Sequence, residues 1–177
     1  MNDNDEQTWR WPNGVRAAAV LTFDVDAESS VLFDAPDAAG RLSIMSHQAY
    51  GPRVGAPRIL GILERHGVHA TFFVPGFTAD RYPEIVRAIA EGGHEIAHHG
   101  YLHESVSSLT SEQEEQVLLR GIDSLERASG RRPIGWRGPM WEVNHETPAL
   151  LAKHGFRYDS SLMDSDNPYI LRAGADA

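Results

Sequence analysis

Short apolar runs alternate with segments of helical character along most of this chain. Apolar runs typical of buried strands occupy residues 16–23, 68–74, 94–98, 134–137 and 156–158. Between and around them, helices are predicted over residues 57–65, 83–90, 111–128 and 147–153. This alternation of strand and helix predicts a parallel α/β sheet, either open or closed into a barrel.

The longest predicted helix, over residues 111–128, carries recognisable signals at both ends. Thr110 or Ser111 is suited to cap its N-terminus, with Gln113 or Glu114 three residues further on to complete a capping box. Gly130 follows its C-terminus, where glycine is favoured because the backbone turns left-handed.

Two segments lack a regular pattern. Residues 27–55 show no clear period and contain proline and glycine, and an irregular stretch of this length in a compact domain is usually functional. Residues 1–14 are expected to form a loose N-terminal arm, pinned by Trp9 and Trp11. One domain is the default for a chain of 177 residues, so residues 15–177 are predicted to form it.

Charge and composition narrow the classes of partner and site. A formal net charge of -9 argues against a nucleic-acid partner, because phosphate binding needs a basic face. The absence of cysteine excludes disulfides and thiolate metal sites, so histidine and carboxylate must hold any metal. Met1–Gln7 is polar and acidic, unlike a secretory signal, and no apolar run is long enough to span a membrane. A cytoplasmic protein without a membrane partner is therefore expected.

Polar side chains with catalytic or ligating chemistry gather where the predicted strands end. The residues at or just past these ends are Asp24, Asp26, His99, His103, Arg137 and Asp159. In parallel α/β architectures the C-terminal ends of the strands form one face, and active sites are built there. Separate segments of the chain are thus expected to converge on one site.

The segment His98–Glu104 carries two histidines four residues apart, His99 and His103. A tight turn after the strand can bring them together, and imidazole with a carboxylate is a common ligand set for zinc. His98 precedes them in extended chain, so its side chain points to the other face and is predicted to pack internally. The alternative for this segment is a polar loop that happens to be rich in histidine.

Asp24 and Asp26 lie two residues apart and share a face if the strand continues straight. Two carboxylates on one face repel each other unless a cation lies between them or they have different tasks. One could bind a metal while the other takes a proton from water that the metal activates. The alternative is a solvated strand end with a helix-capping aspartate.

The segment Trp136–Trp141 places Arg137 directly after a buried strand and fixes a bend with Gly138 and Pro139. The arginine is suited to hold a carboxylate through a bidentate pair and to keep it ionised. Trp141 is suited to wall a substrate pocket. A structural arginine and a core tryptophan are the alternative interpretation.

Four segments, taken in order, resemble the successive motifs of the polysaccharide deacetylase family (NodB homology, carbohydrate esterase family 4). They are Thr22–Asp26, His99–Glu104, Arg137–Trp141 and Tyr158–Ser161, and the resemblance covers about residues 15–165. Each motif alone is of limited specificity, but four in this order are a strong signal. The resemblance implies a distorted (β/α) barrel of seven or eight strands (NodB-type) and a metal-dependent hydrolase of non-peptide C–N bonds.

The resemblance also implies a role for each matching residue. Asp24 matches the catalytic base and Arg137 the arginine that orients it. The metal ligands would be Asp26, His99 and His103. Zinc is the first expectation for this ligand set, and cobalt, nickel or manganese fits the same residues.

The implied substrate contacts come from the later motifs and from the histidine motif. The backbone N–H of Met140 falls where the family stabilises the oxyanion, and Trp141 falls on the pocket wall. Asp159 matches a motif that lines the groove, and Tyr101 is assigned to the same substrate-binding set.

Two departures from the commonest family pattern leave the substrate open. Val25 separates two aspartates that are usually adjacent, and His99–Glu104 reads His-Gly-Tyr-Leu-His-Glu where the family usually begins His-Ser or His-Thr and ends His-Pro. Both departures resemble a subgroup with certain peptidoglycan-type deacetylases, cyclic-imide hydrolases and allantoinase-like enzymes. The family as a whole favours N-deacetylation of an amino-sugar polymer, whereas a cytoplasmic location favours ring opening of a small-molecule imide or ureide.

A non-catalytic carbohydrate-binding protein on a decayed barrel is the alternative of another class, although the complete ligand set argues against it. The resemblance further implies a homo-oligomer.

Five predicted strands are fewer than a NodB-type barrel has, and no residue matches the later histidine motif that supplies the general acid. The barrel is therefore expected to be incomplete at its C-terminus, with the general acid beyond Ala177 or the barrel completed by a partner chain.

Overall fold

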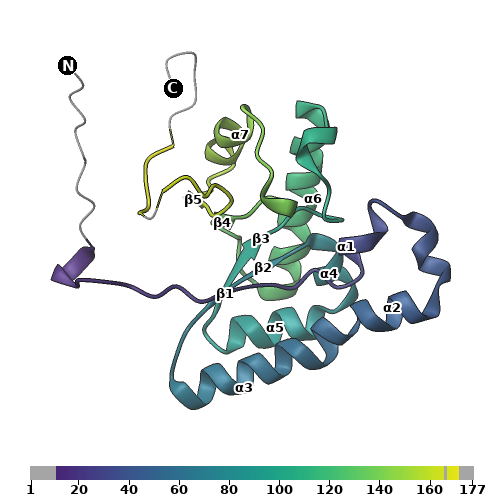
Figure 1. Ribbon diagram of the computed structural model, residues 1–177, viewed down its shortest axis with the longest axis horizontal. Helices are drawn as coiled ribbons and strands as arrows, with labels where there is room; N and C mark the ends of the chain where they lie inside the picture. The colour runs from purple at the N-terminus through teal and green to yellow at the C-terminus, as the bar shows by residue number, and fades with distance from the viewer. Residues whose placement is uncertain (1–10, 166, 172–177) are drawn as a thin grey trace.

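Five short strands form one parallel sheet, in the order in which they follow along the chain (Figure 1). They are β1 (Thr22–Asp24), β2 (Thr71–Val74), β3 (Glu95–His98), β4 (Gly135–Trp136) and β5 (Tyr158–Asp159). The computed structural model describes residues 11–165 and 167–171, so most of the predicted N-terminal arm lies outside the described residues. A strand order that never reverses is typical of a β/α barrel, whereas a doubly wound sheet has a switch point. The predicted parallel α/β sheet of barrel type is confirmed.

Helices of very different lengths connect the strands. They are α1 (Ser29–Leu32), α2 (Leu42–Gln48), α3 (Ala56–His66), α4 (Gly76–Arg81), α5 (Pro83–Glu91), α6 (Ser111–Ser129) and α7 (Thr147–Lys153). In Figure 1, α3 and α5 run side by side below the sheet, and α2 leads away from it. The long helix α6 packs against both α4 and α5.

Two apolar clusters hold the helices against the sheet. The larger one joins Phe72 and Val74 of β2 to Ile89 of α5 and Leu125 of α6, and all four are fully buried. The smaller one joins Trp136 of β4 to side chains of α6 and α7. Burial of each such side chain stabilises the fold by roughly 1.5–3 kcal/mol. The clusters therefore fix the strands whose C-terminal ends carry the candidate functional residues.

The predicted ends of the long helix α6 are confirmed. Thr110 is the N-cap: its hydroxyl accepts from the Gln113 N–H at 3.3 Å, and the Gln113 side chain accepts from the Thr110 N–H at 2.9 Å. This reciprocal pair satisfies two backbone donors that the first helical turn leaves open. Gly130 follows the last turn with φ 72°, as a left-handed C-cap requires.

The first predicted strand is too long. An apolar run over residues 16–23 indicated a buried strand, but β1 begins at Thr22 and residues 13–21 are exposed. The ladder with β2 starts where the Leu21 carbonyl accepts from the Thr71 N–H at 3.0 Å. Earlier residues run past the end of β2, so an apolar side chain such as Val20 stays 71% exposed.

The prediction of an irregular segment over residues 27–55 is wrong, since α1, α2 and short 3₁₀ or π turns at Pro36–Gly40 and Gly51–Gly55 make it largely helical. No sequence pattern predicted α4 either. These three helices have 4, 7 and 6 residues, which is too short for a periodic apolar face to develop.

Within the described residues, no helix combines the length and the apolar character that crossing a membrane requires.

Gly121 of α6 marks a close approach between this helix and β3. A Cβ atom there would lie 2.1 Å from Nε2 of the buried His98. We expect Gly121→Ala to destabilise the protein by about 1–3 kcal/mol through overpacking, seen as a lower urea midpoint.

Gly61→Ala in α3 is the matched control for this prediction. Its Cβ would meet nothing closer than Arg65 Nη1 at 3.6 Å, so the better helix propensity of alanine should stabilise the protein by about 0.5–1 kcal/mol. Equal midpoints for Gly121→Ala and Gly61→Ala would contradict the packing described for α6.

Candidate metal centre

Asp26, His99 and His103 converge beyond the C-terminal ends of β1 and β3. Each offers one ligand atom, and these atoms lie within 4.8 Å of one another. The distance from Asp26 Oδ1 to His99 Nε2 is 3.5 Å, and from Asp26 Oδ2 to His103 Nε2 it is 3.9 Å. Among the described residues no other cluster of histidine and carboxylate meets this criterion. The structure thus brings together the three residues that the sequence analysis assigned to a metal.

One carboxylate oxygen of Asp26, Oδ1, is buried without a hydrogen-bond partner among the described residues. Burial raises the pKa of the Asp26 carboxyl, opposed by the nearby His99 and reinforced by the carboxylate of Asp24. A divalent cation would satisfy the orphaned oxygen and favour the ionised carboxylate, because an opposite charge stabilises the charged form.

The two histidines are prepared to act as neutral ligands. Burial lowers the pKa of His99 and of His103, which favours the uncharged imidazoles that metals bind. Nδ1 of His99 lies 2.7 Å from the Arg137 carbonyl oxygen, which can only accept, so Nδ1 carries the proton. The lone pair of Nε2 is then free and faces Asp26, the usual arrangement for a ligating histidine.

The loop that joins the two histidines is tightly folded. Gly100 has φ 73° and His103 has φ 59°, a left-handed conformation that non-glycine residues rarely adopt. The buried carboxylate of Glu104 accepts from the N–H groups of Tyr101 at 2.9 Å and Leu102 at 2.8 Å. Glu104 therefore folds the loop back so that His103 reaches the cluster, a role that the sequence analysis did not assign to it.

Asp24 and Arg137 form an ion pair next to the metal cluster. The Arg137 Nη1 donates to Asp24 Oδ1 at 2.7 Å. Three further bonds fix the guanidinium: Nη2 donates to Thr22 Oγ1 at 3.1 Å and to Ser160 Oγ at 2.8 Å, and Nε donates to the Ser160 carbonyl at 3.2 Å. The guanidinium also lies over the ring of Phe73, 4.0 Å from its centroid. These bonds hold the Arg137 guanidinium in place against Asp24.

The segment after Arg137 passes close to the histidine loop, since a Cβ at Gly100 would lie 3.0 Å from Pro139 Cγ. Met140 and Trp141 have φ 55° and 58°, and they are 44% and 52% exposed. The Met140 N–H donates to no acceptor among the described residues. The predicted oxyanion contact of this N–H stays a prediction. The Gly138 N–H, by contrast, donates to Ser161 Oγ at 2.8 Å, which ties this segment to the chain after β5.

Asp159 ends β5, where the sequence analysis placed it, and its carboxylate is engaged by a neighbouring serine. Its carboxylate accepts from the Ser161 hydroxyl at 2.6 Å and from the Ser161 N–H at 3.2 Å. Since Ser161 is 1% exposed and holds Gly138, Asp159 acts on the candidate site through this serine. These contacts make Asp159 a supporting residue, and its direct contact with substrate stays a prediction.

Tyr101 is engaged in contacts inside the fold. It is 8% exposed, its hydroxyl donates to Asp80 at 3.2 Å and accepts from Arg120 at 2.8 Å, and the Arg120 guanidinium lies 3.5 Å from its ring centroid. The ring packs so closely on α4 that a Cβ at Gly76 would lie 2.6 Å from it. The side chain is therefore buried between α4 and α6, and the prediction that it binds substrate is not supported by these contacts.

His98 packs internally, as predicted. It is fully buried, its Nε2 donates to the Leu118 carbonyl at 3.1 Å, and its Nδ1 accepts from the Gly100 N–H at 3.1 Å. Burial lowers its pKa to about 3, so the ring is neutral. His98 anchors the start of the histidine loop on α6 and is not a ligand of the cluster.

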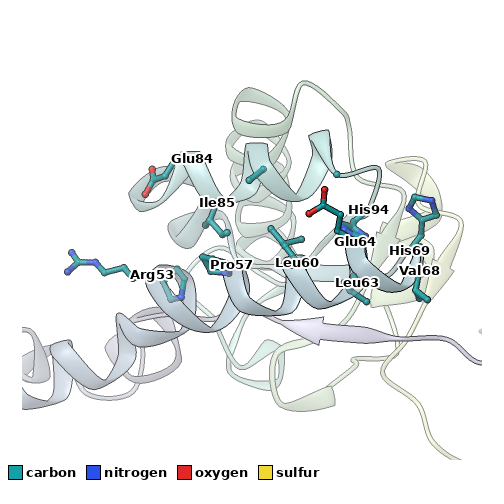
Figure 2. A pocket seen from close by; sticks show the side chains of 15 residues that line it. Arg53, Pro57, Leu60, Leu63, Glu64, Val68, His69, Glu84, Ile85 and His94 are labelled. Carbon is teal, nitrogen blue, oxygen red and sulfur yellow. The ribbon is translucent and has the colours of Figure 1, made fainter.

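A large cavity of about 890 Å³ lies elsewhere, between α3 and α5 (Figure 2). Figure 2 shows Glu64, His69 and His94 at one end of this cavity and Arg53 and Glu84 at the other. His69 and His94 precede β2 and β3, so the cavity opens near the N-terminal ends of these strands. The metal cluster lies beyond the opposite, C-terminal ends, and the cavity is therefore not part of the candidate site.

Comparisons with known proteins are consistent with this geometry. The profile of the polysaccharide deacetylase family matches residues 44–158. The peptidoglycan deacetylase of Helicobacter pylori is 39% identical over 131 residues, which is 73% of this chain and 45% of that protein.

Two solved structures share the fold over most of the chain. A crystal structure assigned to a polysaccharide deacetylase of Mycobacterium smegmatis superimposes with a TM-score of 0.91 at 57% identity, covering 94% of this chain and 58% of that one. The crystal structure of the allantoinase PuuE gives a TM-score of 0.77 at 26% identity, covering 90% and 58%. The chain thus spans about half the length of the relatives that it matches.

Proposed function

Because this chain belongs to the polysaccharide deacetylase family, we propose that it is a metal-dependent hydrolase of non-peptide C–N bonds. The observation that carries the proposal is the adjacency of two arrangements. A three-residue ligand cluster, Asp26 with His99 and His103, lies next to a second carboxylate, Asp24, that Arg137 holds in place. Metal-assisted hydrolysis needs both a metal and a separate proton acceptor.

Asp26, His99 and His103 would hold the metal, and zinc is the metal that we propose for this ligand set. Cobalt, nickel or manganese would fit the same residues. When bound, a divalent metal supplies Lewis acidity, which acidifies water and polarises a carbonyl oxygen. The orphaned Oδ1 of Asp26 and the neutral imidazoles support this fit.

Asp24 would accept the proton of the attacking water, because it is a carboxylate beside the cluster that is not itself one of the three ligands and that Arg137 orients. Arg137 orients this carboxylate through the hydrogen bond at 2.7 Å. The Met140 N–H would donate to the developing oxyanion, as backbone donors do in acyl transfer. Trp141, exposed beside it, would contact the substrate.

For the substrate we propose an N-acetylated amino-sugar polymer, with the chain acting as an N-deacetylase. The similarity to a protein named peptidoglycan deacetylase supports this choice. So does the exposure of Met140 and Trp141, because a polymer must reach the site from solvent without threading into a closed pocket.

Ring opening of a small cyclic imide or ureide is the second candidate. It is favoured by the likeness to an allantoinase structure over 90% of the chain. The cytoplasmic location predicted from the sequence would suit this substrate class, and that location stays a prediction.

One assay panel separates these functions. The protein loaded with zinc or cobalt would be offered N-acetylglucosamine oligomers, with acetate release as the readout, and maleimide, succinimide, hydantoin and allantoin, with loss of the ring as the readout. Acetate release alone would support the deacetylase, and ring opening alone the imidase. Bound metal with no turnover of any compound would count against both and favour a non-catalytic carbohydrate-binding protein.

A further inference from the structure

The backbone beside the proposed metal ligand Asp26 adopts an unfavourable conformation. β1 ends at Asp24, and Ala27, which follows Asp26, has φ 52°. A left-handed alanine is costly and persists only where the surroundings enforce it. The direction of the Asp26 side chain depends on this turn, because the turn sets the backbone from which the carboxylate extends.

Two anchors from the α4 region hold this turn, one on each side of Ala27. Before it, the Asp26 carbonyl accepts from the hydroxyl of Thr78, a fully buried residue of α4, at 2.7 Å. After it, the Glu28 carboxylate accepts from Arg81 Nε at 3.0 Å and from the Tyr82 hydroxyl at 2.6 Å. The turn is therefore fastened to the α4 region at two points, by Thr78 before Ala27 and by Arg81 with Tyr82 after it.

Glu28 is the unusual member of this set. It is 2% exposed, and its second oxygen, Oε2, is buried without a hydrogen-bond partner among the described residues. A buried carboxylate with an unsatisfied oxygen weakens the fold compared with an apolar side chain of similar size. Stability alone therefore does not account for a glutamate at this position.

We propose that Glu28 is a positioning residue for the metal site: its bonds to Arg81 and Tyr82 hold the Ala27 turn and thereby aim the Asp26 carboxylate at His99 and His103. The inference rests on the proposed function in so far as Asp26 is a metal ligand. Glu28 itself does not contact the metal. Its effect is on the affinity of the site, because a preformed ligand set loses less freedom on binding.

The test measures metal binding without any substrate. Cobalt affinity is determined by competition with a chromogenic chelator, the visible absorption of bound cobalt reports its coordination, and the urea midpoint of the metal-free protein reports stability. Glu28→Ala should weaken cobalt binding about 10- to 100-fold, the usual effect of losing an outer partner of a ligand, and change the cobalt spectrum. Glu28→Gln keeps an acceptor oxygen for both donors and should recover most of the affinity.

Glu114→Ala is the matched control. Glu114 is 5% exposed and accepts from the Thr147 hydroxyl at 2.5 Å between α6 and α7, so its removal also deletes a buried, hydrogen-bonded carboxylate. This variant should lose stability but keep its cobalt affinity within about twofold. If Glu28→Ala and Glu114→Ala weaken cobalt binding equally, or neither does, the positioning role is overturned.

Tyr82→Phe keeps the test decisive if Glu28→Ala does not fold, because it removes one of the two donors to Glu28 and leaves the carboxylate. It should weaken cobalt binding more than Thr147→Val, the corresponding change at Glu114, and equal affinities would overturn the proposal. Hydrolysis plays no part in these measurements. Failure of every substrate in the assay panel would therefore reject the proposed function while the comparison of cobalt affinities still stands.

Discussion

His99→Ala is expected to abolish binding of the divalent metal and, with it, hydrolysis. The residue supplies one of three ligands, its side chain is buried, and its Nε2 lies 3.5 Å from Asp26 Oδ1. Two remaining ligands bind the metal too weakly, so metal affinity should fall by more than the roughly 10- to 100-fold lost when a residue that hydrogen-bonds to a ligand is removed. Metal content after dialysis and the cobalt dissociation constant measure the effect, and His103→Ala should behave in the same way.

His66→Ala provides the control for these ligand variants, because His66 is exposed at the end of α3. It should bind metal like the unaltered protein. His98→Ala is a poor control, since His98 is buried and anchors Gly100, so its loss should lower stability. Full metal occupancy in His99→Ala would remove the basis of the ligand assignment.

Asp24→Asn is expected to separate catalysis from metal binding. The asparagine keeps the size of the side chain and an oxygen for the Arg137 bond at 2.7 Å, but it cannot take a proton. We expect kcat to fall by about 100-fold or more, within the usual contribution of a general base, while most of the metal stays bound.

Asp26→Asn is the companion variant and should show the opposite order of effects. It removes the charge of a ligand whose Oδ1 has no other partner among the described residues, so metal affinity should fall first and activity with it. Measuring kcat at saturating metal together with the cobalt dissociation constant distinguishes the two variants. An exchange of these phenotypes would mean that the roles of the two aspartates have been assigned the wrong way round.

The sequence was most informative where one short segment carries both the chemistry and its spacing. His99 and His103 are four residues apart, and the turn that brings them together is formed locally by Gly100 and Glu104. The alternation of strands and helices was readable for the same reason, because the apolar faces of α3, α5 and α6 repeat over several turns. Short elements such as α1 and α4 escaped prediction, since they contain too few residues to show a period.

Partners from distant segments did not follow from the residue pattern alone, and the family resemblance was needed to pair Asp24 with Arg137 and Asp26 with the two histidines. Asp24 and Asp26 lie two residues apart, yet one pairs with Arg137, 113 residues away, and the other faces the two histidines. Asp159 follows a strand end like the others, but Ser161 engages its carboxylate and uses it to hold Gly138. The residue type predicted a polar interaction for each aspartate side chain, and the partner of that interaction depends on the tertiary fold.

By itself, the sequence determined the inventory of the site and its location: histidines, aspartates and an arginine at strand ends that a parallel sheet gathers on one face. The tertiary structure decided the distances and hydrogen bonds between them, and it drew Tyr101 into the interface of α4 and α6. The physical reason is that backbone propensity and hydrophobic period are local properties of a chain. The partner, burial and charge state of a side chain depend instead on packing between segments far apart in sequence, and these become defined only when the chain has folded.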